Sequence, residues 1–337
     1  MHDLAVVSTI EAIRPIVGKD RIVMATVENY NSIVPKDAYK VGDEVVYVFY
    51  DSILPEGNPD FEFLRPRCYS AKLEGFRIRP MKIGEEISEG LVLPISVLPT
   101  GKNYKKGDIV SDDLKIRAYE PAEVATPSEV IGTYPTAIPK SDEENIEKVF
   151  ENYPQWKEIE FYVTEKIDGT AATWFYNAKD DAFRIFSHGW EVGESGVWFD
   201  AARNENLKEK MASYCEAHGL DNLVMQGEVV GPFVQKNLYK VSKASFYIYG
   251  MMTSEGRRYP FEVMKAACEE MGIRMVPLIR EHAHMPDTLD ALLKDCDGRS
   301  TQSDVPREGL VWRSMTPGRD VHFKVKSRPY KIWFDKK

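Results

Sequence analysis

A lysine, a carboxylate and a glycine stand together after a strand-like run. Residues 161–165 resemble a buried strand, and Lys166-Ile167-Asp168-Gly169 follows directly. Residues two apart in an extended chain point to one face, so we expect Lys166 and Asp168 to share a pocket. Gly169 would let the backbone pass close to a ligand. The pattern alone is weak evidence, because an exposed Asp-Gly turn explains it as well.

Two more carboxylates and a lysine pair occur in later strand-like segments. Glu228 stands in an otherwise apolar run, and Glu308 precedes Gly309 at the start of another. A buried carboxylate needs a cation, a metal ion or several donors. Lys324 and Lys326 are two residues apart, so a strand would present both ammonium groups on one face.

An aromatic strand completes the set. The run Phe246-Tyr247-Ile248-Tyr249-Gly250 offers a ring that could stack on a nucleobase. Taken singly, these features fit a salt-bridged carboxylate, a solvated lysine pair or a core aromatic residue. Together they describe a pocket for a polyphosphate nucleotide, with cations for phosphate, carboxylates for Mg²⁺ and a ring for the base.

The order of these motifs resembles that of the covalent nucleotidyltransferases, which include DNA ligases, RNA ligases and mRNA capping enzymes. The resemblance covers residues 141–326 and implies an α+β catalytic domain of antiparallel sheets with flanking helices. The motifs that carry it are KxDG at 166–169, GE at 227–228, FYxY at 246–249, EGxV at 308–311 and KxK at 324–326.

The resemblance implies roles for single residues. Lys166 would be the nucleophile that takes AMP from ATP as a phosphoramidate, with Asp168, Lys324 and Lys326 as further catalytic residues. Mg²⁺ or Mn²⁺ would be held by Asp168, Glu228 and Glu308, and Phe246 would stack on adenine. The implied nucleotide contacts are Glu165, Lys166, Ile167, Glu228, Phe246, Glu308, Val311, Lys324 and Lys326.

A lysine nucleophile must first lose its proton. A free lysine has a pKa near 10.4 and attacks poorly at pH 7. We expect Lys324, Lys326 and a divalent metal to lower the pKa of Lys166. The same cations would stabilise the charge that develops on the phosphoryl oxygens.

The length of 337 residues fits two domains. Short strand-like runs between Gly- and Pro-containing turns fill residues 1–118, which is typical of a small closed all-β barrel. Residues 119–140 are Pro-rich and predict a linker rather than a core element. Residues 141–337 predict strands and helices, the first helix starting at Ser141 with a capping box to Glu144. Further helices are expected around 201–218, 260–271 and 287–297.

The segments before and after residues 141–326 indicate which branch of the superfamily the sequence resembles. DNA ligases and capping enzymes resemble one another in carrying an OB domain after KxK, but eleven residues follow Lys326. Residues 1–118 and the linker at 134–144 are similar to ATP-dependent RNA ligases with an N-terminal OB domain. The resemblance implies sealing of 3′-hydroxyl and 5′-phosphate ends, at nicks in duplex RNA, through lysyl-AMP and RNA-adenylate. Asn145 and His188 stand where this group usually has arginines, which predicts a weaker hold on phosphate.

The basic residues are clustered although the net charge is −9. Residues 65–82 and 308–337 each carry a local charge of +5, which suits a phosphate backbone. Tyr69 and Phe76 lie near the first cluster and could stack on bases. Nucleic-acid contacts are expected at Arg65, Arg67, Lys72, Arg77, Arg79, Lys236 and Lys240.

Two other features of the sequence indicate where in the cell the protein is expected. No apolar stretch is long enough to span a membrane and no signal-peptide core is visible, so we expect a cytoplasmic protein, and nothing calls for more than a monomer. The four cysteines are scattered without a metal-binding spacing, which predicts buried thiols rather than disulfides or zinc.

Two alternatives stay open at this point. The chain could be an OB-fold RNA-binding protein whose nucleotidyltransferase domain is inactive. It could also be a DNA nick ligase or a GTP-using capping-type enzyme. The choice of nucleotide and of 3′-hydroxyl strand separates these possibilities.

Overall fold

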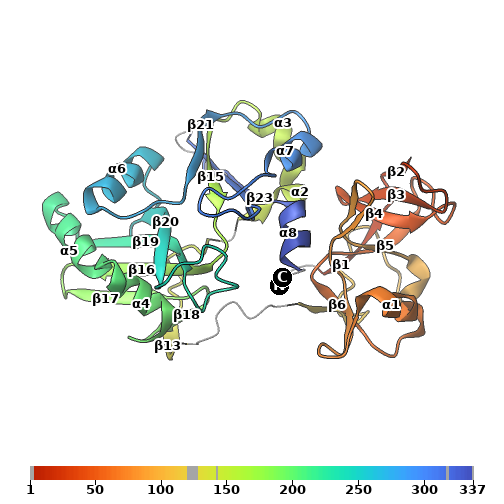
Figure 1. Ribbon diagram of the computed structural model, residues 1–337, viewed down its shortest axis with the longest axis horizontal. Coiled ribbons are helices and arrows are strands. Elements are labelled where there is room, and N and C mark those ends of the chain that lie inside the picture. The colour runs from red at the N-terminus through yellow and green to blue at the C-terminus, as the bar shows by residue number, and fades with distance from the viewer. Residues whose placement is uncertain (1–3, 120–127, 142, 316–318, 336–337) are drawn as a thin grey trace. The chain divides into compact units, whose positions relative to one another are not determined.

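The computed structural model describes residues 4–119, 128–141, 143–315 and 319–335. The chain divides into two compact units (Figure 1). One comprises Met1–Pro121 with Lys331–Lys337, and the other is Ala122–Tyr330. Within the described residues, no helix is long and apolar enough to cross a membrane.

Short antiparallel sheets build the first unit around two apolar cores. Alternate residues of a strand point to opposite faces. Val46 and Val48 therefore enter one core, whereas Val45 and Tyr47 enter the other. The elements of this unit are β1 (Ala5–Thr9), β2 (Ala12–Pro15), β3 (Ile22–Val27), β4 (Tyr30–Pro35), β5 (Glu44–Val48), β6 (Ser52–Pro55), α1 (Arg65–Cys68), β7 (Tyr69–Ser70), β8 (Gly75–Arg77), β9 (Met81–Ile83), β10 (Glu86–Ser88), β11 (Leu91–Pro94) and β12 (Arg117–Ala118).

Two sheets form the frame of the second unit. The six-stranded sheet, in its spatial order, contains β13 (Val130–Thr133), β18 (Trp190–Val192), β17 (Ala182–Phe186), β16 (Thr170–Asn177), β19 (Asn222–Val230) and β20 (Ser245–Met252). The five-stranded sheet contains β14 (Glu144–Asn145), β23 (His322–Lys326), β22 (Gly309–Ser314), β15 (Phe161–Lys166) and β21 (Leu278–Ala283).

Helices bury one face of each sheet. Trp174 and Met225 of the six-stranded sheet share a core with Met211 and Met264 of the helices. The helices on this side are α4 (Gly196–Asn204), α5 (Leu207–His218) and α6 (Phe261–Met271). The five-stranded sheet packs against α2 (Ile146–Val149) and α7 (Leu289–Asp295), through a core that includes Phe161, Phe323 and Leu292. Among the described residues, the remaining α-helices are α3 (Tyr153–Trp156) and α8 (Arg328–Phe334), and short 3-10 helices occur at Pro59–Leu64, Ile95–Val97 and Phe150–Asn152.

The expected barrel-like β unit followed by an α+β unit is confirmed, and the strand runs around Lys166, Glu228, Glu308 and Lys324 match β15, β19, β22 and β23. Three local expectations are wrong. The helix expected around 201–218 is two helices, α4 and α5, which meet at Asn206 in a left-handed conformation (φ 50°). The capping box at Ser141 does not form, because 144–145 is a strand and α2 begins at Ile146.

The third correction concerns the segment expected to be a linker. Residues 130–133 form β13, an edge strand of the six-stranded sheet. Ile138 is buried against Val224 and Met252. The linker was predicted because the segment is rich in proline, but an edge strand tolerates proline close to its ends. Residues 120–127 lie outside the described residues.

Of the four cysteines, Cys215, Cys268 and Cys296 are buried thiols as expected, whereas Cys68 is half-buried.

Candidate active site

Three strands bring Lys166 and the lysine pair to one face of the five-stranded sheet. Lys166 ends β15 opposite Gly309 of β22, which lies opposite Lys326 of β23. Directly opposed residues point to the same face, and Lys324 and Val311, two residues away along their strands, point there too. With strands about 4.8 Å apart, the backbones of Lys166 and Lys326 are about 10 Å apart.

Lys166 forms an ion pair with Glu308. Its Nζ donates a hydrogen bond to Glu308 Oε1 at 2.6 Å, and the two side chains are 24% and 16% exposed. Glu308 Oε2 is buried and has no hydrogen-bond partner among the described residues. That oxygen is therefore placed to accept a hydrogen bond from a bound ligand, such as a ribose hydroxyl or a metal-bound water.

Carboxylates keep Lys166 protonated. Burial lowers the pKa of its amine, but the charges of Glu308, Glu228 and Asp168 raise it, and the net shift is upward. The net shift is opposite to the expected lowering, because in the protein without a metal ion or nucleotide the nearby carboxylates dominate the electrostatics of the amine. At neutral pH the amine is a cation and must lose its proton before it can attack.

Glu228 comes to the site from the six-stranded sheet. It lies on β19 opposite Ala171 of β16 and Tyr247 of β20. Tyr247 and Tyr249 pack with Ile167, the residue after Lys166, in one buried cluster. This cluster joins the end of β15 to the face of the six-stranded sheet that carries Glu228.

The structure corrects the expectation for Phe246. Phe246 is 1% exposed and packs on Trp174, with ring centroids 4.8 Å apart, in the core beneath the helices. Strand alternation puts Tyr247 on the opposite face, beside Glu228. Tyr247 and Tyr249, rather than Phe246, are the rings on the side of Lys166.

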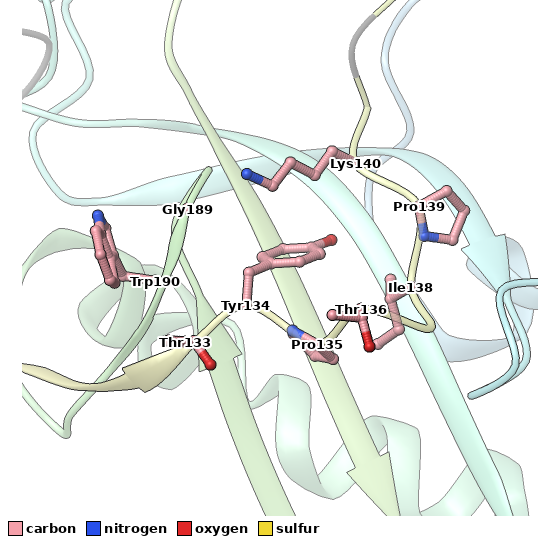
Figure 2. Close-up of a pocket in the computed structure, with 9 residues that line it drawn as sticks. All are labelled: Thr133, Tyr134, Pro135, Thr136, Ile138, Pro139, Lys140, Gly189 and Trp190. Atoms are coloured by element: carbon pink, nitrogen blue, oxygen red, sulfur yellow. The ribbon is translucent and has the colours of Figure 1, made fainter.

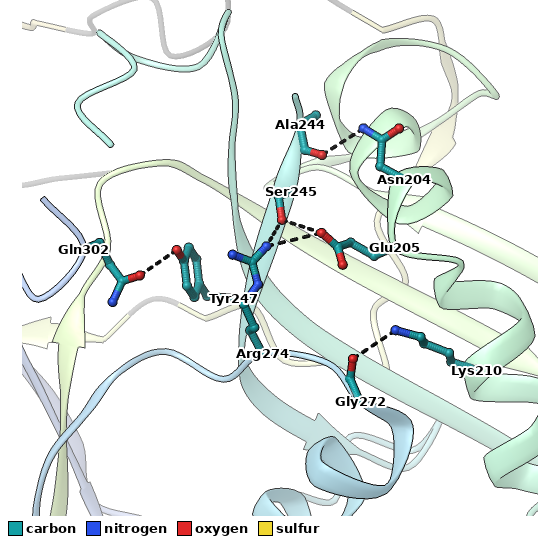
Figure 3. Close-up of polar contacts among 9 residues, drawn as sticks. All are labelled: Asn204, Glu205, Lys210, Ala244, Ser245, Tyr247, Gly272, Arg274 and Gln302. Carbon is teal, nitrogen blue, oxygen red and sulfur yellow. Dashed lines mark hydrogen bonds and ion pairs between the residues drawn. The ribbon is translucent and has the colours of Figure 1, made fainter. Parts of the chain in front are cut away.

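Polar contacts fix Tyr247 (Figure 3). Its hydroxyl donates to Gln302 Oε1 at 2.8 Å, and the guanidinium carbon of Arg274 lies 4.8 Å from its ring centroid. Arg274 in turn donates to Ser245 Oγ and to Glu205 Oε1. These contacts hold the ring in one orientation before any ligand arrives.

Glu165 points away from Lys166 along the strand. It is 1% exposed, and its Oε2 accepts hydrogen bonds from the Thr301 backbone N–H at 2.9 Å and hydroxyl at 2.7 Å. Gln302 Nε2 donates to the same Thr301 hydroxyl. The side chain of Glu165 thus anchors the loop that also holds Tyr247, which is a different contact from the one the family pattern implied.

The turn after Lys166 is tightly packed. The Asp168 backbone N–H donates to the Tyr239 hydroxyl at 2.8 Å. A Cβ at Gly169 would lie 2.3 Å from the carbonyl oxygen of Val229 and 2.9 Å from Glu228 Cγ. Glycine is therefore required by the close approach of β19.

Asn145 and His188 are the two departures from the family pattern. Asn145 pairs with Lys324 in the parallel β14–β23 ladder, at the edge of the five-stranded sheet. Its Oδ1 is buried without a hydrogen-bond partner among the described residues. His188 is exposed at the β17–β18 turn. Asn145 thus stands beside the lysine pair, where it provides an amide rather than a charge.

A divalent metal would need oxygen ligands from outside the protein. Among the described residues, no group of three or more His, Cys, Asp and Glu side chains is arranged to hold a metal ion. Mg²⁺ typically takes one or two carboxylates and completes its shell with phosphate oxygens and water. The free oxygen of Glu308 and the carboxylates around Lys166 fit that pattern.

Only some basic side chains of residues 65–82, in the first unit, are exposed and not bound by carboxylates, and so could contact nucleic acid. Arg67, Lys72 and Arg79 are exposed, and Arg65 is exposed but pairs with Glu56 and Glu62. Arg77 forms ion pairs with Asp51 and Asp335, at 3.3 Å and 2.9 Å. The expected stacking of Phe76 on a base is contradicted, because Phe76 is fully buried in the core.

In the second unit, Lys236 and Lys240 are exposed in the loop after β19. The nearby Phe233 is 60% exposed. An exposed ring beside ammonium groups suits a single nucleic-acid strand.

The sequence prediction missed several residues that hold the site together. Glu143 and Arg313 form a buried ion pair at 2.5 Å, and Tyr330 of α8 lies close enough to Asp168 for that carboxylate to raise its pKa further beyond the effect of burial. Only the pairing register could have identified Tyr247, because it shows which residues share a face with Glu228. The register itself depends on contacts distant in sequence.

Comparison with known proteins agrees with this geometry. A family model of an OB-fold domain matches residues 4–95, and the RNA ligase family model matches residues 159–328, which is half of the chain. The chain belongs to the RNA ligase family. The second match contains Lys166, Glu228, Glu308 and the lysine pair. A search of curated proteins found no match.

Solved structures of a Naegleria gruberi RNA ligase are similar over the whole chain. The structure with pyrophosphate is 27% identical, has a TM-score of 0.87, and the match covers 100% of both chains. A point mutant with ATP and manganese is 26% identical, with a TM-score of 0.86 and 99% of each chain covered. Another mutant, with AMP and manganese, has the same identity and TM-score and covers 100% of this chain and 99% of that chain.

Proposed function

We propose that this RNA ligase uses ATP to join 3′-hydroxyl and 5′-phosphate ends at nicks in duplex RNA, in RNA repair. The observation that carries the proposal is that Lys166 and the lysine pair share one sheet face, while Glu308 is hydrogen-bonded to the amine of Lys166 and Glu228 acts on the same amine. The RNA ligase family match and the likeness to a ligase solved with ATP and manganese support it.

Three steps follow from this arrangement. The unprotonated Lys166 Nζ attacks the α-phosphorus of ATP, a P–N bond forms, and pyrophosphate leaves. The 5′-phosphate of the RNA then displaces the amine and takes AMP. Finally the 3′-hydroxyl attacks that phosphate, AMP leaves, and the strands are joined. Lys324 and Lys326 stabilise the negative charge that grows on the phosphate oxygens in each step.

The carboxylates divide the other tasks. Glu308 orients Lys166 through its 2.6 Å hydrogen bond, and its second oxygen binds the ribose or a metal-bound water. A bound divalent metal supplies positive charge that offsets the three carboxylates and so favours loss of the lysine proton. Tyr247 and Tyr249 offer rings for the adenine base.

The substrate class is tested with nicked duplexes that differ only in the sugar of the strand that ends in the 3′-hydroxyl. We expect RNA at that strand to be sealed at least about 10-fold faster than DNA, since a 2′-hydroxyl can donate and accept hydrogen bonds that DNA lacks. Gel-based single-turnover rates measure the difference. Equal sealing of all-DNA nicks would rule out the RNA preference.

Labelling with nucleotide separates the active ligase from an inactive RNA-binding protein. If the protein is an ATP-dependent ligase, incubation with Mg²⁺ and α-labelled ATP should give an acid-labile protein adduct, and α-labelled GTP should give much less. No adduct from either nucleotide would favour the inactive protein, and transfer of GMP would favour a capping-type enzyme. The complete set of Lys166, Glu228, Glu308 and the lysine pair favours the active enzyme.

The raised pKa of Lys166 predicts a pH dependence for the first step. Because the amine must lose a proton, the single-turnover rate of adduct formation should rise about 10-fold per pH unit between roughly pH 6 and 8. Glu308→Gln removes a charge that raises this pKa, so its profile should shift to lower pH, although its maximum rate falls. A rate independent of pH in both proteins would contradict protonation control at Lys166.

A further inference from the structure

A cavity of about 770 Å³ lies in the second unit, outside the residues assigned above to AMP or metal (Figure 2). Its size falls within the range of about 300–1,000 Å³ that is usual for small-ligand sites. One wall is the segment Thr133–Lys140, and the other is the turn at Gly189 and Trp190.

Two aromatic rings and one cation line the cavity. Trp190 is 53% exposed at the start of β18, directly opposite Thr133 of β13. Lys140 lies with its ammonium nitrogen 5.6 Å from the Tyr134 ring centroid, and in Figure 2 it extends toward the space between Tyr134 and Trp190. Among the described residues, Lys140 forms no ion pair with a carboxylate, and its ammonium group lies near the Tyr134 ring.

The Tyr134 wall is held rigidly. The Tyr134 hydroxyl lies 2.9 Å from Thr173 Oγ1 and accepts a hydrogen bond from Gln226 Nε2 at 3.2 Å. Gln226 also donates to the backbone carbonyl of Pro139 at 2.8 Å, and Phe186 packs on the Tyr134 ring. A wall that is already ordered loses little conformational entropy when a ligand binds.

The cavity lies next to the candidate active site on the same sheet. Thr173 and Gln226, which hold the Tyr134 wall, are paired across β16 and β19. Ala171 and Glu228 are the next pair on that face, two residues further along each strand. Two residues of a strand span about 7 Å, so a chain bound near Glu228 can reach the cavity within one or two nucleotides.

We infer that this cavity binds an unpaired nucleobase of the RNA strand next to the break, stacked on Trp190 and with its phosphate at Lys140. An accessible indole, a second ring and an ammonium group are the groups that bind a single-stranded nucleotide without reading its sequence. Thr133 and Thr136 add hydroxyls for the sugar or the base edge. The inference rests on the proposed RNA ligation, and it adds that one nucleotide next to the break leaves the duplex and is bound unpaired.

Binding of a short fluorescein-labelled single-stranded RNA, followed by anisotropy, tests the inference. Trp190→Ala should raise the Kd about 10-fold, which is typical of losing one base–aromatic stack, and Trp190→Phe should restore most of the affinity. Lys140→Ala should weaken binding and reduce its salt dependence. Val263→Ala removes a 39% exposed apolar side chain on α6 and serves as the matched surface control.

Two further measurements separate this site from the active site. Replacing one nucleotide of the RNA by an abasic one should raise the Kd for the native protein but should change the Kd for Trp190→Ala only slightly. Adduct formation with α-labelled ATP should be the same in both proteins. An unchanged Kd in Trp190→Ala, or a loss of ATP adduct as large as the loss of RNA binding, would overturn the inference. Failure of the proposed ligation would appear differently, as no adduct in the native protein.

Discussion

Lys166→Ala is expected to abolish the acid-labile adduct with ATP, a fall of at least about 10³-fold, because the variant lacks the only atom proposed to bond to phosphorus. Lys166→Arg is the sharper variant. A guanidinium preserves the positive charge beside Glu308, yet it does not lose its proton at any pH compatible with folding. We expect no adduct from Lys166→Arg either, measured with α-labelled ATP under single-turnover conditions.

Two controls separate chemistry from folding. Lys179→Ala removes an exposed lysine that pairs with Asp221, and it should form the adduct at the native rate. RNA that already carries a 5′-adenylate bypasses the first step, so Lys166→Arg should seal this RNA with a much smaller loss. An adduct on the Lys166→Ala protein would mean that another side chain is the nucleophile.

The strands that carry the site could be predicted from the sequence because their signals are local. An alternating or apolar run bounded by glycine or a charged pair identifies β15, β19, β22 and β23, and the i, i+2 spacing puts Lys324 and Lys326 on one face. These are properties of a few consecutive residues. They hold whatever the strand pairs with.

Contacts between distant segments could not be predicted in the same way. Whether Phe246 or Tyr247 faces the site depends on the register of β19 against β20, in which a shift by one residue exchanges the two faces. The protonation of Lys166 depends on Glu228 and Glu308, which are 62 and 142 positions further along the chain. The sequence shows these lysines and carboxylates equally well but does not show which of them dominate at the amine, and in the fold the carboxylates raise its pKa.

The second large effect concerns stability. The Glu143–Arg313 pair is buried, with both side chains 9% exposed and the two atoms 2.5 Å apart. Arg313→Met should lower the free energy of unfolding by about 3–5 kcal/mol, because it leaves a buried carboxylate without its cation. Urea denaturation followed by tryptophan fluorescence measures the loss. A change below about 1 kcal/mol would show that water or another cation compensates Glu143.

The double variant Glu143→Gln with Arg313→Met distinguishes loss of the charge pair from loss of packing. It removes both charges, so its free energy of unfolding should be larger than that of Arg313→Met and could approach that of the native protein.

The pH dependence of stability gives a second test of the Glu143–Arg313 pair. Burial raises the pKa of Glu143, but Arg313, His322 and Lys324 lower it, and the net shift is downward. In the native protein this carboxyl therefore stabilises the fold above its unfolded pKa, and that stabilisation is lost as the pH falls through its depressed folded value. Without Arg313, burial acts against a weaker opposing charge and the Glu143 pKa should rise. Protonation then relieves the variant as the pH falls, so the stability difference between Arg313→Met and the native protein should narrow below about pH 5. The double variant has no carboxyl at this position and gains no such relief, so its difference from the native protein should narrow less, and only through the stabilisation that the native protein itself loses. A difference between Arg313→Met and the native protein that is constant with pH would mean that the arginine acts through its contacts with the Tyr249 ring and Thr164 Oγ1 rather than through its ion pair with Glu143.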